Sequence, residues 1–297
     1  MSAFPIDYIE PVFRPPSEAH SLILPVTNGC SWNNCTFCGQ MYTAPQKKFR
    51  ARDENQVLDE IRKSGEQLIV QRVFLADGDA MILPTKRLLR ILEAIREHMP
   101  SVERVTSYCL PRNLKRKSVE ELRQLREAGL AMLYVGAESG DDQVLERVNK
   151  GETYASTEEA LSKSGEAGIQ RSVMILNGLG GKGLSEQHAL NSARLMNATQ
   201  PEFLSTLVVS FPQGLARYRE RFPDFEPLDQ PSLFRELESL IGMLELDNTV
   251  FRSDHASNAL VLKGVLGADK ERMLAQVQAA ISRPEQARLR PEWMRGL

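Results

Sequence analysis

Segments with strand character and segments with helix character alternate along this chain from residue 21 to about residue 210. The helical segments are amphipathic, as in "TKRLLRILEAIREHM" at 85–99, where apolar residues recur every three or four positions. The strand-like segments are short runs of aliphatic and β-branched residues, at 21–27, 71–76, 104–109, 131–138, 169–176 and 203–211. Because a helix between two strands lets both run in the same direction, this alternation predicts an α/β protein with a parallel sheet.

Six strands are too few to close the eight-stranded barrel that repeated strand–helix units often form. We therefore predict an α/β fold, a partial (β/α)6 TIM-like barrel with a parallel sheet and a small C-terminal helical extension. The predicted parts are an N-terminal arm at 1–20, the barrel core at 21–210 and an extension at 211–297 that closes the barrel. In such a barrel, functional residues are expected at the C-terminal ends of the strands.

The composition of the 297-residue chain is that of a soluble globular protein, with 42% hydrophobic and 26% charged residues. A net charge of −2 and a pI of about 6.2 do not indicate a general attraction to nucleic acid or to anionic lipid. The sequence shows no apolar run of membrane-spanning length, and residues 1–20 lack the apolar core of a secretory signal. We therefore expect a cytoplasmic protein, in which clustered cysteines are more often metal ligands than disulfides.

Three of the four cysteines lie within nine positions, in "CSWNNCTFC", with the spacing Cys30-x4-Cys35-x2-Cys38. A zinc site would need a fourth ligand such as His20, and a ferredoxin-type cluster would need a fourth cysteine and another spacing. Unrelated reduced thiols are the remaining alternative. An iron–sulfur cluster held by three thiolates, with one iron open to a further ligand, fits this segment best.

The same segment resembles the cluster-binding motif of the radical S-adenosylmethionine (SAM) superfamily, which is C-x3-C-x2-C with an aromatic residue before the last cysteine. Phe37 occupies the aromatic position, and the first gap is longer by one residue. The resemblance implies a [4Fe–4S] cluster on Cys30, Cys35 and Cys38, with Phe37 near the cofactors. It also implies SAM as the second cofactor and a reducing electron donor of the flavodoxin or ferredoxin type.

A second resemblance lies in "FLADGDAM", which follows the second predicted strand. In the superfamily, a Gly-Gly-Glu-like motif at this place holds the amino group of SAM, and here the matching residues are Asp77, Gly78 and Asp79. Carboxylates and backbone carbonyls are the acceptors that an ammonium group needs. An ordinary Asp-Gly-Asp turn is the alternative.

Two later strands carry further residues that resemble SAM contacts of the family. Glu138 ends the fourth strand, where it would bind the ribose hydroxyls or the ammonium of SAM, and Ser139 is predicted to contact SAM or to cap the next helix. Arg171 is a candidate for the SAM carboxylate, with a surface charge as the alternative. The turn after the fifth strand resembles the adenine-contact segment, in which glycine lets the backbone approach a flat ring: Asn177, Gly178, Leu179 and Gly180.

The resemblance implies reductive cleavage of SAM to methionine and a 5′-deoxyadenosyl radical that abstracts hydrogen from a substrate. No cysteine follows Cys109, so we predict a single cluster. A small-molecule substrate is the leading hypothesis. Modification of RNA or of a protein side chain is a second hypothesis, and a non-catalytic zinc or iron–sulfur protein is a third.

Two further residues are candidates for the substrate site. Cys109 ends the third predicted strand, where it would donate a hydrogen atom or contact substrate, unless it is a small buried apolar residue. His255 lies in the polar stretch "RSDHASN" at 252–258 and is a candidate for proton transfer. The alternative for this stretch is an internal network that holds the C-terminal segment in place.

Overall fold

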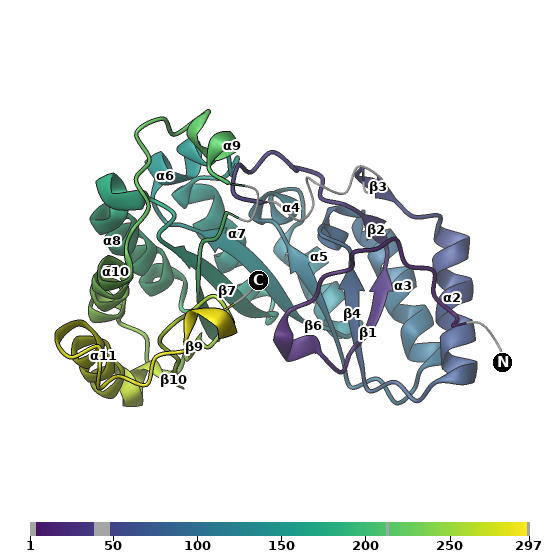
Figure 1. The fold of residues 1–297 in the computed structure, drawn as a ribbon. Helices are drawn as coiled ribbons and strands as arrows, with labels where there is room; N and C mark the ends of the chain where they lie inside the picture. Colours follow the sequence, from purple (N-terminus) through teal and green to yellow (C-terminus); the bar gives the residue numbers. More distant parts are fainter. Residues whose placement is uncertain (1–3, 39–47, 212–213, 296–297) are drawn as a thin grey trace. The chain divides into compact units, whose positions relative to one another are not determined.

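The computed structural model describes residues 4–38, 48–211 and 214–295 (Figure 1). Its strands form an eight-stranded sheet in the order β1-β4-β5-β6-β7-β8-β9-β10 and a two-stranded sheet of β2 and β3. The chain divides into two compact units, whose described residues fall within 1–33, 40–135 and 162–171 for unit 1 and within 34–39, 136–161 and 172–297 for unit 2.

Unit 1 contains parallel strands that pair in the order β1, β4, β5 and the first part of β6. These strands are β1 (Leu22–Pro25), β4 (Arg72–Ala76), β5 (Arg104–Cys109) and β6 (Leu130–Glu138). Its helical elements are η1 (Pro16–Glu18), α2 (Glu54–Gln67), η3 (Ala80–Ile82), α3 (Thr85–His98), α4 (Pro111–Lys115) and α5 (Val119–Glu127). The short strands β2 (Thr27–Asn28) and β3 (Arg50–Ala51) pair antiparallel.

The helices of unit 1 form where the sequence supplies both an apolar face and an N-terminal cap. The side chain of Asp53 accepts a hydrogen bond from the amide of Gln56 at the start of α2. Ser118 and Glu121 form the predicted capping box at the start of α5. The buried face of α3 consists of residues three or four positions apart, namely Leu88, Ile91, Leu92 and Ile95.

Unit 2 continues β6 and adds four strands: β7 (Gln170–Asn177), β8 (Phe203–Val208), β9 (Val250–Ser253) and β10 (Leu262–Val265). Strands β7, β8 and β9 are parallel, and β10 pairs antiparallel with β9. The helical elements are α6 (Asp142–Arg147), α7 (Tyr154–Glu166), α8 (Gly181–Thr199), α9 (Ala216–Arg219), α10 (Gln230–Met243), α11 (Leu266–Ser282) and η4 (Glu292–Met294). The boundary between the units falls within β6, α7 and β7.

The six predicted strands correspond to β1, β4, β5, β6, β7 and β8, which confirms the α/β prediction with its parallel sheet. The C-terminal extension was expected to be helical, but it also contributes β9 and β10 to the sheet. These strands have only four residues each, so the sequence offers little periodicity, while Phe251 of β9 and Leu262 of β10 are fully buried.

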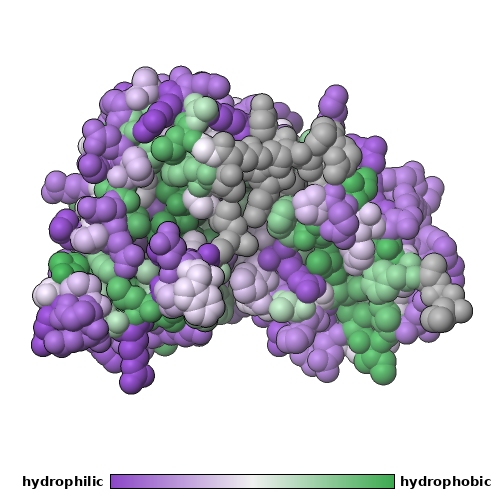
Figure 2. Space-filling model, viewed as in Figure 1, coloured by the Kyte–Doolittle hydropathy of each residue, from purple (hydrophilic) through white to green (hydrophobic). Residues whose placement is uncertain are grey.

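None of the helices in the described ranges is long and apolar enough to cross a membrane. Figure 2 shows hydrophilic side chains over the outward faces of α2 and α11.

Candidate cofactor-binding site

The cysteine segment begins at the carboxyl end of β1, and the Asp-Gly-Asp turn begins at the carboxyl end of the neighbouring strand β4. Parallel pairing brings these two strand ends to the same edge of the sheet. The turn then holds the cysteine segment through its carboxylates. Asp77 Oδ2 accepts from the amide of Gly29 at 3.4 Å, and Asp79 Oδ2 accepts from the amide of Ser31 at 3.2 Å. Cys30 lies between these two anchored amides, so this part of the predicted site is assembled in unit 1.

Asp79 has an unusual environment for a carboxylate. Its side chain is fully buried, and Oδ1 accepts no hydrogen bond from any residue in the described ranges. Burial raises the pKa of Asp79, and the hydrogen bonds from Ser31 lower it in part. A buried acceptor without a partner costs free energy, so this oxygen is suited to a donor that arrives with a ligand.

Replacing Asp79 with asparagine is expected to raise the thermal stability of the cofactor-free protein and to weaken its affinity for SAM. The amide removes the cost of burying a charge, so the Tm of the cofactor-free variant is expected to rise. Burial raises the pKa of Asp79 in the folded state above 3.8. Between the pKa of the unfolded state and that of the folded state, the folded protein therefore keeps a proton on Asp79 that the unfolded protein has released. The stability gain is therefore expected to grow as the pH rises from about 4 through the folded-state pKa.

Calorimetry of the apoprotein and equilibrium binding of SAM to the reconstituted protein measure the two effects separately. Asp53→Asn is the matched control, because Asp53 is an exposed helix cap and asparagine caps equally well. A lower Tm for Asp79→Asn together with unchanged SAM affinity would contradict the assignment.

The second part of the cysteine segment belongs to unit 2 and is bound by the turn that follows α6. The backbone amide and Oγ1 of Thr36 donate to the carbonyl of Val148 at 2.9 Å and 3.3 Å. The carbonyl of Cys38 accepts from Arg217 Nη1 at 3.4 Å. Phe37 packs against the apolar cluster of this unit, which contains Val144, Val148, Leu176, Leu179, Tyr218, Phe222 and Phe225. Phe37 therefore anchors the segment that carries Cys35 and Cys38.

Glu138 lies at the carboxyl end of β6 in a left-handed backbone conformation, with φ of +66°. Its Oε1 forms an ion pair of 2.9 Å with Lys150 Nζ, and both side chains are buried. Oε2 is also buried and has no hydrogen-bond partner in the part of the chain that the structure describes. The ammonium of Lys150 lies 6.0 Å from the centre of the Phe37 ring. Glu138 and the cysteine segment thus share Lys150 as a neighbour.

The glycine turn begins at the carboxyl end of β7 with Asn177, whose Oδ1 is buried without a partner among the described residues. Gly178 follows with φ of +83°, and its amide donates to Oε1 of Glu236 at 2.6 Å. The carbonyl of Leu179 accepts from the hydroxyl of Tyr218. Gly180 is the N-cap of α8. The backbone of this turn is therefore held from two sides, while the Asn177 side chain keeps an open acceptor.

Ser139 does not cap α6, so that prediction was wrong. The cap is Asp141, whose Oδ1 accepts from the amide of Val144 at 2.9 Å. The Ser139 hydroxyl lies 2.7 Å from Nδ1 of His188 and accepts from the amide of Asp141. Because Nε2 of His188 faces the carbonyl of Leu176 at 3.1 Å, Nε2 carries the proton and the Ser139 hydroxyl donates to Nδ1.

Arg171 lies at the opposite end of its strand from the other candidates. It is the second residue of β7, it is buried, and its guanidinium fills the space beside Gly165 of α7. A Cβ at Gly165 would lie 2.4 Å from Nη1 of Arg171. The structure therefore places Arg171 away from the carboxyl edge, and we do not include it in the site proposed below.

Cys109 is the last residue of β5 and is buried. Neighbouring residues of a strand point to opposite faces, so Cys109 and Tyr108 lie on different faces of the sheet. The ring of Tyr108 contacts Phe74 and Tyr134 edge-on, at centroid distances of 4.9 Å and 6.3 Å. Tyr108 is half-buried, and its hydroxyl has no hydrogen bond to a described residue. No sequence motif indicated Tyr108, yet it is the residue of this pair whose polar group has no hydrogen bond to a described residue.

His255 follows β9 and belongs to a hydrogen-bonded network at the carboxyl end of β8. Its Nδ1 accepts from the amide of Ser257 at 3.2 Å, and the Ser257 hydroxyl accepts from the amide of Val208 at 3.1 Å. Arg290 donates to the carbonyls of His255 and Asn258. The network ties the C-terminal segment to β8, as the alternative for this stretch anticipated. A role of His255 in proton transfer stays a prediction.

Replacing His255 with glutamine is expected to reduce the loss of folding stability that the protein shows as the pH falls below about 6.5. Burial, and then the nearby guanidinium of Arg290, lower the pKa of His255 below 6.5. The unfolded state therefore binds more protons in this window, so the contribution of His255 to stability is lost as the pH falls from 6.5 through the folded-state pKa. Chemical denaturation at several pH values checks the difference between variant and parent. If the stability of the variant and of the parent changes equally with pH, the lowered pKa of His255 is contradicted. If the variant has normal stability but forms no product, the result supports the predicted role of His255 in proton transfer.

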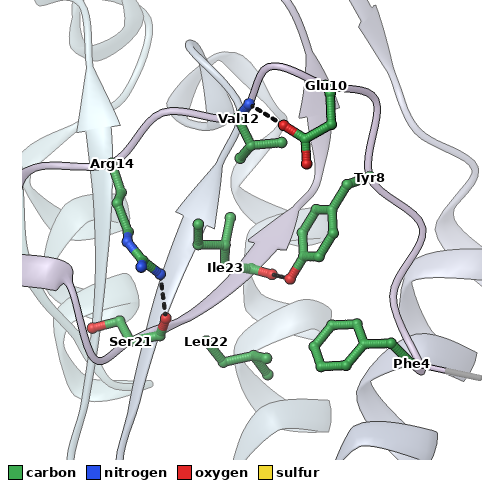
Figure 3. Close-up of a pocket in the computed structure, with 8 residues that line it drawn as sticks. All are labelled: Phe4, Tyr8, Glu10, Val12, Arg14, Ser21, Leu22 and Ile23. Atoms are coloured by element: carbon green, nitrogen blue, oxygen red, sulfur yellow. Dashed lines mark hydrogen bonds between the residues drawn. The ribbon is translucent and has the colours of Figure 1, made fainter. Parts of the chain in front are cut away.

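A separate cavity of about 330 Å³ lies in unit 1, at the N-terminal arm (Figure 3). None of the site residues predicted from the sequence lines it. The lining residues are Phe4, Tyr8, Glu10, Val12, Arg14, Ser21, Leu22 and Ile23. The Tyr8 hydroxyl donates to the carbonyl of Ile23, and burial raises the pKa of Tyr8 to about 12.

The thiols and the oxygen acceptors among the candidate residues fit the cofactors that the sequence implies, a [4Fe–4S] cluster and SAM. None of the four cysteines, all of which lie in the described ranges, forms a disulfide, and Cys30, Cys35 and Cys38 are half-buried. Within residues 4–38, 48–211 and 214–295, no three His, Cys, Asp or Glu side chains are already gathered around a metal position. The unsatisfied oxygens of Asp79, Glu138 and Asn177 are acceptors suited to the ammonium and hydroxyl groups of SAM.

Comparison with known proteins agrees with these observations. Residues 24–196, more than half of the chain, match the family model described as Radical SAM superfamily. The heme chaperone HemW of Bacillus subtilis is 23% identical over 157 residues, which are 52% of this chain and 41% of that protein. The 4′-phospho-dehydrooxetanocin synthase of Priestia megaterium is 27% identical over 150 residues, which are 45% of this chain and 20% of that protein. The chain thus spans less than half the length of these relatives.

Solved structures resemble the fold at low sequence identity. Coproporphyrinogen III oxidase (HemN) from Escherichia coli, itself a radical SAM enzyme, has a TM-score of 0.57 at 16% identity, covering 91% of this chain and 70% of that chain. Radical SAM proteins use a [4Fe–4S] cluster together with SAM. On the match over residues 24–196, this chain belongs to the radical SAM superfamily.

Proposed function

We propose that this enzyme holds a [4Fe–4S] cluster on Cys30, Cys35 and Cys38, cleaves SAM reductively, and directs the resulting radical at a small-molecule substrate. The bound cluster supplies the electron that splits SAM into methionine and a 5′-deoxyadenosyl radical. One observation carries the proposal. Three residues at the carboxyl ends of β4, β6 and β7 each keep a buried oxygen without a partner in the described structure, namely Asp79, Glu138 and Asn177.

Each of these oxygens has a defined task in SAM binding. Asp79 Oδ1 would accept from the ammonium of the methionine part, since its other oxygen already holds the amide of Ser31 beside Cys30. Glu138 Oε2 would accept from the ribose hydroxyls. The ammonium of Lys150 holds the other oxygen of that carboxylate, Oε1, at 2.9 Å. Asn177 Oδ1 would accept from the exocyclic amine of adenine.

The glycine turn has the backbone needed to contact a flat ring. Gly178 has a positive φ that other residues adopt only with strain, and Glu236 holds its amide. Glu236 also accepts from the hydroxyl of Ser185 on α8 at 2.5 Å. A fixed backbone loses little freedom when adenine binds, which favours affinity. Glu236 and Lys150 therefore join the proposed site as positioning residues.

A small-molecule substrate remains our proposal for the reaction. The net charge of −2 does not indicate binding of a polyanion. In the aromatic group of Phe74, Tyr108 and Tyr134 in unit 1, Phe74 and Tyr134 are buried, and the half-buried Tyr108 is the member that would contact a substrate. Modification of RNA or of a protein is the alternative, and it predicts strongly salt-dependent binding of that polymer.

Anaerobic reconstitution tests the proposed function directly. The protein is loaded with iron and sulfide, reduced with dithionite and mixed with SAM, and 5′-deoxyadenosine is measured by chromatography. Formation of about one cluster per chain and of 5′-deoxyadenosine is the expected result. A four-iron cluster that does not bind SAM would contradict the assignment of Asp79, Glu138 and Asn177.

A further inference from the structure

Helix α8 holds the loop that follows Glu138 at the carboxyl end of β6. Each of the next three residues, Ser139, Gly140 and Asp141, forms a hydrogen bond to a side chain of α8. Those positions of α8 repeat at an interval of four residues, so they lie on one face of the helix. They are Gln187, His188, Asn191 and Ser192. The loop beside Glu138 is therefore fixed against α8.

Glycine at position 140 lets this loop approach the helix closely. A Cβ at Gly140 would lie 2.2 Å from the carbonyl oxygen of Asn191, so no larger residue fits here without a shift of the backbone. The amide of Gly140 donates to Oγ of Ser192 at 2.9 Å. The position of α8 therefore determines the position of the residues next to Glu138.

His188 differs from its neighbours on this face because it also bonds to the next strand. Its Nδ1 lies 2.7 Å from Oγ of Ser139, and its Nε2 lies 3.1 Å from the carbonyl oxygen of Leu176. Leu176 directly precedes Asn177 and Gly178 in the chain. His188 is only 1% exposed, so it is too buried to contact a ligand itself. It joins the carboxyl ends of β6 and β7 within unit 2.

Each nitrogen of the His188 ring has one role in this connection. Nε2 donates to the carbonyl of Leu176, and Nδ1 accepts from the hydroxyl of Ser139, which in turn accepts from the amide of Asp141 at 3.0 Å. Turning the ring over would place carbon atoms at both contacts and leave buried polar groups without partners. The ring therefore fixes the separation between the two strand ends.

A buried carboxylate adds a second connection to the same turn. Oε1 of Glu236 lies 4.0 Å from Nε2 of His188 and accepts from the amide of Gly178 at 2.6 Å. Glu236 belongs to α10, which packs beside α8 (Figure 1). Its other oxygen accepts from the hydroxyl of Ser185 on α8. His188 and Glu236 thus hold the turn after β7 at Leu176 and at Gly178.

We propose that His188 is a positioning residue that sets the distance between Glu138 and the turn at 177–180, and so sets the affinity for the adenosine half of SAM. The inference rests on the proposed function, in which Glu138 binds the ribose and Asn177 binds adenine. Ribose and adenine are joined by a single bond, so the separation of their polar groups varies little. A site that already holds its two halves at this separation loses less freedom on binding and therefore binds more tightly.

Three variants interrupt the connection at different atoms. His188→Gln retains a donor for the carbonyl of Leu176 and lacks the acceptor at the place of Nδ1. His188→Asn retains an acceptor for Ser139 and lacks the donor to Leu176. Ser139→Ala removes the hydroxyl and leaves the imidazole in place. Calorimetric unfolding shows that a variant is folded, and each folded variant tests the proposal by itself.

Thr199→Val is the matched control on the same helix. Thr199 is buried in the last turn of α8, and its hydroxyl donates to the carbonyl of Leu195 at 2.8 Å. The change removes a buried hydrogen bond without altering a group that bonds to the end of β6 or β7. Titration calorimetry measures the binding of 5′-deoxyadenosine to the full-length apoprotein, since this molecule contains adenine and ribose and needs no cluster. Binding of SAM to the reconstituted protein is measured for the same variants.

We expect both His188 variants and Ser139→Ala to bind 5′-deoxyadenosine about 10-fold more weakly than the parent, which is the scale of one lost hydrogen bond. Thr199→Val should have a lower Tm and normal binding. Since Ser139→Ala and His188→Gln break the same hydrogen bond, the variant with both changes should lose little more affinity than either single variant.

The other outcomes separate this proposal from the proposed function. Normal binding by a folded His188 variant would overturn the positioning role and leave the proposed function intact. An equal loss in Thr199→Val would also overturn it, because affinity would then follow stability in general. If the parent apoprotein does not bind 5′-deoxyadenosine, the adenosine site at Glu138 and Asn177 is wrong, and the role of His188 is rejected with it. Formation of 5′-deoxyadenosine by the reconstituted parent then decides separately whether SAM is cleaved.

Discussion

Replacing Cys38 with alanine is expected to abolish 5′-deoxyadenosine formation and to leave the reconstituted protein without a stable four-iron cluster. The physical reason is the number of ligands. Cys30, Cys35 and Cys38 are the only three cysteines on one segment, and two thiolates do not hold a cluster that already has one iron open. Iron and sulfide analysis, together with the visible absorption of the cluster, measures the loss independently of activity. The same result is expected for Cys30→Ala and for Cys35→Ala.

The fourth cysteine provides the matched control. Cys109 is buried on β5, on the face opposite to Tyr108, so Cys109→Ser should retain cluster content and deoxyadenosine formation within about two-fold. Loss of turnover with an intact cluster in Cys109→Ser would support hydrogen donation by this residue. Full cluster content in Cys38→Ala would reject the three-thiolate site.

Replacing Lys150 with alanine is expected to destabilise the protein by about 3–5 kcal/mol, because it leaves the carboxylate of Glu138 buried without a counter-charge. Nζ of Lys150 lies 2.9 Å from Glu138 Oε1, and the two side chains are only 4% and 7% exposed. Oε2 has no partner within the described ranges, so no other group there compensates that oxygen. The loss corresponds to a fall in Tm of about 10 °C, which calorimetry of the apoprotein measures.

A double variant separates charge from packing. Lys150→Met combined with Glu138→Gln removes both charges at similar volume, so it should recover most of the stability that Lys150→Ala loses. The double variant is still expected to bind SAM poorly, since the carboxylate is absent. If Lys150→Ala changes Tm by less than about 2 °C, the carboxylate has access to solvent or to another partner, and our account of Glu138 is wrong.

Local patterns in the sequence were sufficient for the elements and for part of the site. Ser118 and Glu121 predicted the start of α5, because a capping box depends on residues three positions apart. Asp77 and Asp79 were selected because their turn, after the second predicted strand, resembles the amino-group motif of the superfamily, and parallel pairing of β1 with β4 brings this turn to the cysteine segment. Both cases depend on backbone geometry within one turn or between neighbouring strands.

Other parts of the site depended on contacts between distant segments. Lys150 lies 12 residues after Glu138, and Glu236 reaches the amide of Gly178 from 58 residues away. Ser139 was expected to cap a helix but instead meets His188, 49 residues later. Nothing near these residues in the sequence indicates their partners, because a lone lysine, histidine or glutamate on an amphipathic helix is usually an exposed charge.

The sequence by itself determined the class of the protein. Alternation of strands and helices predicts a parallel sheet, and three closely spaced cysteines predict a ligand set, since both depend on local periodicity and on side-chain chemistry. Only the tertiary structure decided where the candidate side chains lie and which partners they have. Tyr108, and not Cys109, lies on the aromatic face of β5. Arg171 lies at the amino end of β7, opposite to the other candidates. Asp79, Glu138 and Asn177 each have a buried oxygen that accepts no hydrogen bond from a described residue. Burial and pairing are properties of the packed chain, so they cannot be obtained from the residues one segment at a time.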